Sequence, residues 1–435
     1  MKLRSVHAEN FRAIRSLTVP LDPALTVLHG NNAHGKTSVL AAIAVGLGAI
    51  PTLLAGRGGI NFRKSDCRSD AADFTWVDLD AWVGLDGAEA IQWRRYDVGD
   101  GMATRSRPDR LFGTMSLRKY IETLATAVEN SKETTIPVIA FYDTDRAVFD
   151  IPERKRGFQG EFHRFNTYID ALARKTSFKA MVEWFYANEN QELRLQRDKQ
   201  DSTLRLPALA SVRRAISGML PDVSEPHIEY PAQFVVWRKP GNSPPEKLLL
   251  EQLSGGYRIV LAMAADLALR MALANPHLPD PLQSEAIVLI DEIELHLHPE
   301  WQQRILCDLR RTFPNAQFIV STHSPQVLTT VEPQHIIHLR ATEDGIVAEQ
   351  ETGPTYGAKA GNVLRALMGV DERPDNDFTQ LLKRYQAMIA NGAGETPEAV
   401  QMRSELEHLS RDPQLAALDV EIARRRVMRD IAARR

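Results

Sequence analysis

Short apolar runs divide the first third of the chain into strands around one helix. Residues Leu3–Phe11 alternate apolar and polar positions, and Leu25–His29 feeds directly into a glycine-rich loop. Alternation of this kind predicts half-buried strands. The small apolar residues of Ser38–Leu47 predict a helix packed closely on a sheet, and Ile136–Tyr142 predicts a buried strand that closes this lobe. Two further strand candidates are Phe74–Val77 and Ile91–Trp93.

The middle of the chain has a different periodicity. From residue 158 to about 220 the apolar positions take helical spacing, as in Phe165, Tyr168 and Leu172. The polar run Asn188–Ser202 predicts a solvated stretch between helices, and Ile228–Arg238 predicts a strand. We therefore expect a helical lobe here.

Helices and apolar strands alternate in the last third. Tyr257–Ala274 predicts a helix, Ala286–Ile290 a strand, Pro299–Thr312 an amphipathic helix, and Gln317–Ser321 a further strand. This alternation predicts a parallel sheet covered by helices. Beyond Leu339 the sequence is polar with helical spacing. The expected fold class is α/β, with a mainly parallel sheet, an antiparallel β subdomain, a helical lobe and a helical C-terminal tail.

Composition and charge narrow the classes of function. The 435 residues carry a net charge of -3, so bulk charge gives no reason to expect nucleic acid. Cys67 and Cys307 form no CxxC pair, which fits a reducing cytosol. The N-terminus lacks the apolar core of a signal peptide. Tyr257–Ala274 is about as long as a membrane span but carries Arg258 and Asp266, so we interpret it as a buried helix and expect a cytoplasmic protein without a membrane partner.

A complete GxxxxGK[ST] pattern lies between the strand Leu25–His29 and the helix that follows it. Its glycines allow backbone N–H groups to surround phosphates, and Lys36 supplies a positive charge to the β and γ groups. The Thr37 hydroxyl can ligate Mg²⁺. An incidental glycine turn is the alternative, but the strand and helix around the pattern favour a phosphate loop. Its residues are Gly30, Asn31, Asn32, Ala33, His34, Gly35, Lys36, Thr37 and Ser38.

Three later segments complete a predicted ATPase site. Four apolar residues end in Asp291 and Glu292; we expect the first to hold Mg²⁺ and the second to polarise the attacking water. Ser254 is predicted to cap the helix after it, and the next two residues, Gly255 and Gly256, permit close approach to an anion. His323 follows an apolar strand, where it can hydrogen-bond a γ-phosphate.

Each of these segments has a plainer interpretation when taken alone. The two carboxylates could be solvated strand ends, the serine a simple cap, and the histidine structural. Their order along one chain favours the shared site. His296 and His298 are two positions apart and cannot share a helical face, so we expect no zinc site from that pair.

The ordered set resembles the ABC-type ATPases of the RecF, SMC and OLD-like AAA group. The likeness rests on Val6–Arg12, Asp291–Pro299 and Ser321–Pro325. Within that group the chain looks most like the PtuA ATPases of Septu and retron-associated antiphage systems, through Ile136–Arg146 and Phe165–Leu172. The resemblance implies an ABC-type P-loop ATPase head.

The family resemblance also implies partners and a division into domains. In such ATPases Ser254 and its glycines would act on ATP held by Lys36 of a second copy, giving a homodimer or a higher oligomer. Such families place a glutamine after the strand that ends the first lobe, whereas Asp143–Arg146 stand here. The expected domains are an ATPase lobe at 1–150, a helical insert and linker at 151–250, a second ATPase lobe at 251–340, and a C-terminal helical region, a candidate for partner binding, at 341–435.

We expect ATP and Mg²⁺ as cofactors and a separate effector, an HNH-type nuclease, as the partner in antiphage defence. One alternative is a RecF-like DNA repair ATPase that binds DNA. A second is an ABC transport motor, which the long insert and the absence of a membrane segment disfavour. The sequence does not decide whether nucleic acid is bound directly.

Overall fold

The computed structural model describes residues 1–55, 59–68, 74–84, 89–98, 113–131, 133–144, 163–173, 178–229, 233–239 and 241–433. Contacts divide the chain into two compact units, Met1–Val363 and Leu364–Arg435. The predicted nucleotide-handling segments all fall in the first unit.

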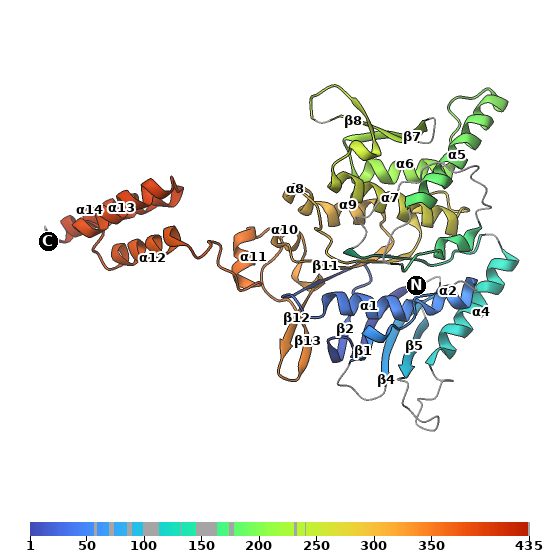
Figure 1. Ribbon diagram of the computed structural model, residues 1–435, viewed down its shortest axis with the longest axis horizontal. Helices are drawn as coiled ribbons and strands as arrows, with labels where there is room; N and C mark the ends of the chain where they lie inside the picture. Colours follow the sequence, from blue (N-terminus) through green and yellow to red (C-terminus); the bar gives the residue numbers. More distant parts are fainter. Residues whose placement is uncertain are drawn as a thin grey trace. The chain divides into compact units, whose positions relative to one another are not determined.

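The centre of the first unit is a six-stranded sheet (Figure 1). Neighbouring strands are parallel except at one edge, where the last strand pairs antiparallel. All residues of four of its strands, Leu25–His29, Val138–Tyr142, Ala286–Ile290 and Ala316–Ser321, are buried, as expected for a sheet covered on both faces. In spatial order the strands are β13 (Gly345–Gln350), β12 (Ile336–Thr342), β3 (Leu25–His29), β11 (Ala316–Ser321), β10 (Ala286–Ile290) and β6 (Val138–Tyr142).

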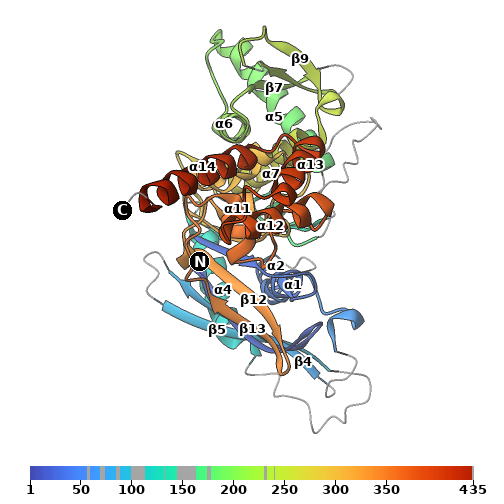
Figure 2. The same ribbon diagram turned by 90° about the vertical axis from the view of Figure 1, so that its left-hand side faces the viewer.

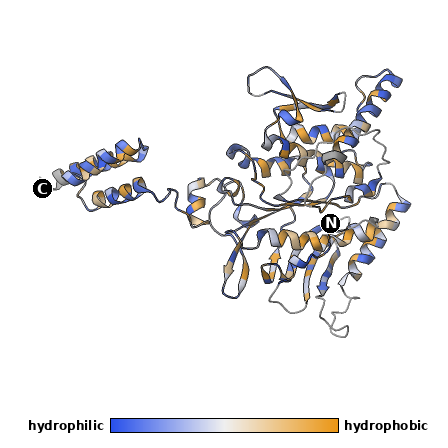
Figure 3. Cartoon of the chain, in the orientation of Figure 1, coloured by the Kyte–Doolittle hydropathy of each residue, from blue (hydrophilic) through white to orange (hydrophobic). Residues whose placement is uncertain are grey.

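A second, antiparallel sheet lies on the other side of helix α1 (Lys36–Leu47). Because α1 contacts both sheets, all of its residues except Thr37 are buried. A helix that is apolar all round needs such an environment, and Figure 3 shows its apolar colouring. The strands of this sheet, in order, are β2 (Ile14–Pro20), β1 (Lys2–Phe11), β4 (Phe74–Val83) and β5 (Glu89–Val98).

One apolar stretch in the described residues, Lys36–Leu54, has the length and hydropathy of a membrane span. In the fold it belongs to α1 and α2, and 78% of its most apolar window is buried inside the protein. The core helix of a globular fold has the same properties, so the stretch is weak evidence for a membrane segment.

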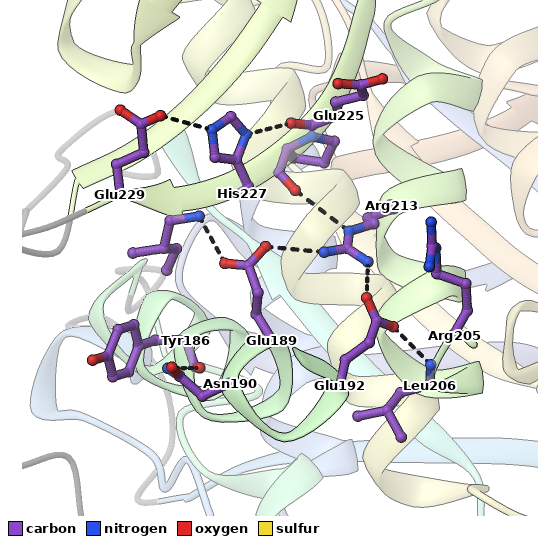
Figure 4. A network of polar contacts seen from close by, with 12 residues as sticks. Tyr186, Glu189, Asn190, Glu192, Arg205, Leu206, Arg213, Glu225, His227 and Glu229 are labelled. Carbon is purple, nitrogen blue, oxygen red and sulfur yellow. Dashed lines mark hydrogen bonds and ion pairs between the residues drawn. The ribbon is translucent and has the colours of Figure 1, made fainter. Parts of the chain in front are cut away.

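A helical lobe with a small antiparallel sheet follows β6 along the chain. Arg213 on α6 donates to Glu189 and Glu192 on α5, at 3.0 and 2.6 Å (Figure 4). Glu189 also accepts from the backbone N–H of Ile228, at 2.8 Å, so one ionic network joins both helices to the sheet. The elements are α5 (Phe178–Lys199), α6 (Pro207–Met219), β7 (Val223–Glu229), β8 (Gln233–Arg238), β9 (Glu246–Leu249) and α7 (Gly255–Ala274).

The other described helices as far as Ala366 range from single 3-10 turns to the 16-residue α4. They are α2 (Ala49–Ala55), η1 (Lys64–Asp66), α4 (Met115–Asn130), η4 (Arg164–Tyr168), η5 (Leu250–Gln252), η6 (Pro281–Gln283), α8 (Pro299–Gln302), α9 (Ile305–Thr312), α10 (Pro325–Leu328), η7 (Pro333–His335) and α11 (Ala360–Ala366).

The second unit contains three helices around a small core of its own (Figure 2, red). Side-chain caps start two of them: Asn376 accepts from the N–H of Thr379, and Thr396 accepts from that of Ala399. The helices are α12 (Asp377–Ala390), α13 (Pro397–Leu409) and α14 (Pro413–Ala433), and the buried residues between them are Leu382, Tyr385, Ile389, Ala399, Met402, Leu406 and Leu415.

The predicted fold class is confirmed by this arrangement of sheets and helices. Two local predictions are wrong. The polar run Asn188–Ser202 is not a solvated stretch between helices, because α5 continues to Lys199 and uses these polar residues on its exposed face and in its ion pairs. The segment Ile228–Arg238 is not one strand but parts of β7 and β8, which pair antiparallel.

Two further boundaries differ from the prediction. The helix expected at Pro299–Thr312 breaks into α8 and α9, with Arg304 in a non-helical conformation between them. The chain beyond Leu339 is not wholly helical, because β13 pairs with β12 through a tight turn at the positive-φ Gly345 before the helices begin. Residues 158–162, which opened the predicted helical region, lie outside the described ranges.

Candidate nucleotide site

The loop from β3 to α1 has the backbone shape of a phosphate cradle. Gly30 has a φ of 150°, and a Cβ placed there would lie 2.3 Å from the carbonyl oxygen of Leu339. Gly35 has a φ of 86° and starts α1 without a side-chain cap. Only glycine fits the first position, and the second leaves the N–H groups of the first helical turn open to an anion.

Lys36 lies inside this loop. Its Nζ donates to the carbonyl oxygens of Gly30 and Asn31, at 2.8 and 2.9 Å, and its side chain is buried. Burial lowers the pKa of Lys36, while the carboxylates of Asp291 and Glu292 oppose that shift. The Lys36 ammonium therefore lies close enough to the two predicted carboxylates for their charges to act on its pKa.

Thr37, the predicted magnesium ligand of the loop, is exposed on the first turn of α1. It lines a small cavity of about 20 Å³ together with Asp143, the residue directly after β6. Asp143 is the first residue of the segment that stands where related ATPases have a glutamine. Asp145 and Arg146 of that segment lie outside the described residues.

Strand β11 lies between the phosphate-loop strand β3 and the carboxylate strand β10. Its last residue, Ser321, joins the two predicted carboxylate positions. The Ser321 hydroxyl donates to Asp291 and accepts from the backbone N–H of Glu292, at 2.8 Å. Asp291 is only 1% exposed, and its own N–H donates to the carbonyl of Tyr142 on β6, at 2.9 Å. Strand β6 thus holds the backbone of Asp291, and β11 holds its carboxylate.

Glu292 has an unusual backbone conformation, with a φ of 46°. A non-glycine residue at such a φ is strained by about 1–3 kcal/mol and persists only where its surroundings hold it. The hydrogen bond from its N–H to Ser321 supplies part of that restraint. Backbone strain of this kind is common at functional sites.

His323 is held by a second carboxylate. Glu294 accepts from the N–H of His323, at 2.5 Å, and from the hydroxyl of Thr322, at 2.7 Å. Burial lowers the pKa of His323, and the charge of Lys36 lowers it further, against the opposing carboxylates. The imidazole is therefore neutral at neutral pH and lies near the lysine.

Ser321 and Glu294 are the residues that the sequence reasoning did not assign. Both lie inside the segments that carried it: Ser321 ends an apolar strand, and Glu294 follows Glu292 by two positions. The periodicity of one strand does not show which strands will be its neighbours. Ser321 and Glu294 have their partners because β11 lies between β3 and β10.

The structure places the predicted segment Ser254–Gly256 in a different pocket from the phosphate loop. Ser254 is the N-cap residue of α7, is exposed, and makes no capping bond with its side chain. A Cβ on Gly256 would lie 2.9 Å from the carbonyl oxygen of His296, whereas one on Gly255 would meet nothing within 4 Å. These three residues line an open groove of about 500 Å³ with His296 and Trp301, among others. Of the described residues that line it, none belongs to the phosphate loop or to β11.

The chain is similar in sequence to known ATPases. Residues 107–329 match the family described as "AAA domain, putative AbiEii toxin, Type IV TA system", and residues 1–47 match an AAA ATPase domain. The chain is similar to the Retron Ec83 probable ATPase of Escherichia coli, with 27% identity over 98% of this chain and 87% of that protein. It is similar to the Retron Vc95 probable ATPase of Vibrio cholerae, with 24% identity over 90% and 84%.

Shorter or weaker likenesses accompany these. A Septu protein PtuA from Bacillus mycoides is 30% identical over 37% of this chain and 22% of its own length. Among solved structures, an SMC head bound to the C-winged helix domain of ScpA aligns with a TM-score of 0.49 and 16% identity, covering 80% of this chain and 98% of that one.

Proposed function

We propose how the chain works from the premise that it is an ABC-type ATPase and belongs to the family described as "AAA domain, putative AbiEii toxin, Type IV TA system". It hydrolyses ATP with Mg²⁺ between two copies of itself. The closed pair regulates a separate effector, an HNH-type nuclease, in cytoplasmic antiphage defence.

The phosphate loop fits a triphosphate. Its glycines leave room where a Cβ would collide, and the first turn of α1 has no side-chain cap. We assign the binding of the phosphates to the backbone N–H groups of Gly30–Ser38 and to the ammonium of Lys36. Before nucleotide binds, that ammonium is held in place by the loop's own carbonyl oxygens, so it is preorganised for an anion.

Acid and hydroxyl groups near the loop support a hydrolytic step. The Thr37 hydroxyl and the Asp291 carboxylate would hold Mg²⁺, which when bound neutralises phosphate charge. Glu292 is assigned to orient and polarise the attacking water, with its backbone fixed through Ser321. Neutral His323 would donate a hydrogen bond to the γ-phosphate, positioned by Glu294.

The exposed start of α7 is the observation that carries the two-copy arrangement. Ser254 and Gly255 present an uncapped helix start in an open groove that contains no phosphate-loop residue among those described. One chain therefore supplies two separate parts of an ATPase site. Two chains related by a twofold axis would complete both sites, each joining the Lys36 loop of one copy to the Ser254 segment of the other.

The defence role is supported by the relatives, whose names place them in retron and Septu systems. The second unit is our candidate for the partner-binding region, because helix α14 carries the exposed apolar residues Val420, Val427 and Met428. Apolar side chains exposed along one helix are typical of interaction surfaces.

A mixture of two inactive variants tests the composite site. Lys36→Ala removes the phosphate contact, and Ser254→Arg blocks the groove, so each variant alone should hydrolyse no ATP. Random mixed dimers retain one intact site, so an equal mixture should regain about a quarter of the parent activity if sites act independently. Ser224→Arg, an exposed serine on β7, is the matched control. A mixture as inactive as its parts would contradict the two-copy arrangement.

Replacing Glu292, the proposed general base, tests its role in hydrolysis and the link to the effector together. Glu292→Gln should bind ATP, lose turnover and accumulate as a dimer in analytical ultracentrifugation. Turnover near the parent rate would remove Glu292 from its role. The partner nuclease should then change its cleavage rate with this trapped dimer but not with Lys36→Ala. Tight, salt-sensitive, ATP-dependent DNA binding by the chain alone would instead favour the RecF-like alternative.

A further inference from the structure

Three metal-ligating side chains meet beside the phosphate loop, at the edge of the central sheet. His29 is the last residue of β3, His338 lies opposite it in register on β12, and Glu351 directly follows β13. Their nearest ligand atoms all lie within 4.8 Å of one another. The nucleotide site described above uses none of the three.

The contacts among these side chains are close but leave one nitrogen without a partner. The two imidazole rings stack with centroids 4.3 Å apart and an interplanar angle of 26°. Nε2 of His29 lies 3.9 Å from the Glu351 carboxylate, beyond hydrogen-bond distance. His29 is 2% exposed, and this nitrogen has no hydrogen-bond partner in the part of the chain that the structure describes. Buried polar atoms are rarely left in that state without a role.

The three side chains offer the kinds of donor atom that a metal ion takes. A neutral imidazole offers a lone pair, and Glu351 offers a negative charge. Two imidazoles and a carboxylate are a ligand set that Zn²⁺ accepts.

We propose that His29, His338 and Glu351 bind a transition-metal ion of the Zn²⁺ class, with a fourth position open to water. Ligand bonds of about 2.0–2.1 Å in a tetrahedron place ligand atoms about 3.4 Å apart. The 3.9 Å between His29 and Glu351 is near that value, and metal binding would draw the ligand atoms together from a widest separation of at most 4.8 Å.

The site would stabilise the start of the phosphate loop. His29 directly precedes Gly30, and Leu339, directly after His338, contacts the loop at two points. Its carbonyl oxygen accepts from Nδ1 of His34, at 3.1 Å, and packs against Gly30. An ion that joins β3 to β12 would therefore restrain the loop from outside the nucleotide site. This inference does not depend on ATP hydrolysis.

Metal titration of the full chain tests the proposal without nucleotide. The protein is stripped with EDTA, dialysed, and titrated with Zn²⁺ against a chromophoric chelator. We expect one tight site per chain. Loss of an outer-shell partner weakens zinc binding about 10–100-fold, so loss of a ligand in Glu351→Gln or His338→Gln should weaken it about 100-fold or more. Glu332→Gln and His408→Gln remove an exposed carboxylate and an exposed imidazole elsewhere and should bind as the parent does.

A cobalt spectrum separates loss of a ligand from loss of the fold. Co²⁺ in the parent should give the intense visible bands of tetrahedral coordination. His338→Cys replaces one ligand by another, so it should keep those bands and add a near-ultraviolet thiolate-to-cobalt transition. Zinc binding equally tight in the parent, Glu351→Gln and His338→Gln would overturn the proposal. So would a parent that binds zinc no more tightly than about 10 μM, or a His338→Cys protein without the thiolate transition.

Discussion

Removing the Ser321 hydroxyl should loosen both carboxylate positions of the nucleotide site at once. In the folded protein this hydroxyl donates to the Asp291 carboxylate and accepts from the N–H of Glu292. Ser321 itself is fully buried, so water cannot replace the lost oxygen without rearrangement. The Ser321→Ala substitution deletes only that oxygen and preserves the strand.

The two lost bonds set the magnitude. A hydrogen bond to a charged group contributes about 1.5–3 kcal/mol and a neutral one about 0.5–1.5 kcal/mol. The free energy of unfolding should therefore fall by about 2–4.5 kcal/mol. Release of the Glu292 N–H should also relax its strained backbone. We expect kcat to fall more than ATP affinity, because Lys36 and the loop are not touched.

Tryptophan fluorescence in urea measures this change in the relevant unit alone. The chain has six tryptophans, all at or before Trp301, so the signal comes from the unit Met1–Val363. Trp93 is buried on the antiparallel sheet and should report its unfolding. The midpoint should fall with an unchanged denaturant slope.

Ser224→Ala is the matched control, since Ser224 is an exposed serine on a strand. It should change stability by less than about 0.5 kcal/mol. The reasoning is refuted if Ser321→Ala unfolds within about 0.5 kcal/mol of the parent, because the bridge would then contribute nothing measurable.

Three other changes have predicted outcomes. Asp266→Ala leaves the buried Arg270 guanidinium without its carboxylate, so urea unfolding should show a loss of about 3–5 kcal/mol. Gly30→Ala drives a Cβ toward the Leu339 carbonyl at a strained φ, so calorimetry should show at least tenfold weaker nucleotide binding, about 1.4 kcal/mol. His323 keeps a lowered pKa, so the acid limb of kcat/KM that it causes should lie below pH 6.5, the value for a free imidazole.

Controls separate these effects from general damage. Asp198→Ala removes an exposed acid and should be neutral; an equal loss in both proteins would contradict the buried-pair argument. Gly241→Ala also forces a positive φ, but nothing lies within 4 Å of its new Cβ, so it should leave nucleotide binding unchanged.

For His323 the sign follows from its shifted pKa. Because the folded pKa is depressed, the native imidazole stays neutral below pH 6.5 while the unfolded one gains a proton, so the free energy of unfolding falls from about pH 6.5 down to the folded pKa. His323→Gln should lack that acid limb. An acid limb above pH 6.5 that vanishes in this variant would contradict the lowered pKa.

Much of the central sheet could be predicted because its strands are locally distinctive. The strands Leu25–His29 and Ala286–Ile290 were predicted at their observed bounds, since each is a continuous buried apolar run next to a motif. The end of α5 was not, because polar residues such as Glu192 form ion pairs with another helix that sequence does not reveal. Hydrophobic periodicity indicates which positions are buried. A polar residue that is buried with an ion-pair partner therefore looks, in the sequence, like a residue of a loop.

The site was predicted as a set of residue types, but not as a set of contacts. Motif spacing indicated Lys36, Asp291 and His323 because phosphate chemistry needs those groups. The roles of Ser321 and Glu294 depend on strand order, in which β11 lies between β3 and β10. Strand order is decided by packing across hundreds of residues, so no local pattern contains it.

Helix α7 gives a physical route from the exposed groove to Asp291, the proposed Mg²⁺ ligand. It begins at the Ser254 cap and carries Asp266 three turns later, where the Tyr142 hydroxyl donates to that carboxylate, at 2.9 Å. The Tyr142 carbonyl in turn accepts from the N–H of Asp291, at 2.9 Å. A second copy that pressed on the start of this rigid helix would thus act on the strand end beside Asp291. Contact between copies and the geometry of hydrolysis would then be linked through two hydrogen bonds, which is what a dimer that signals its nucleotide state to an effector requires.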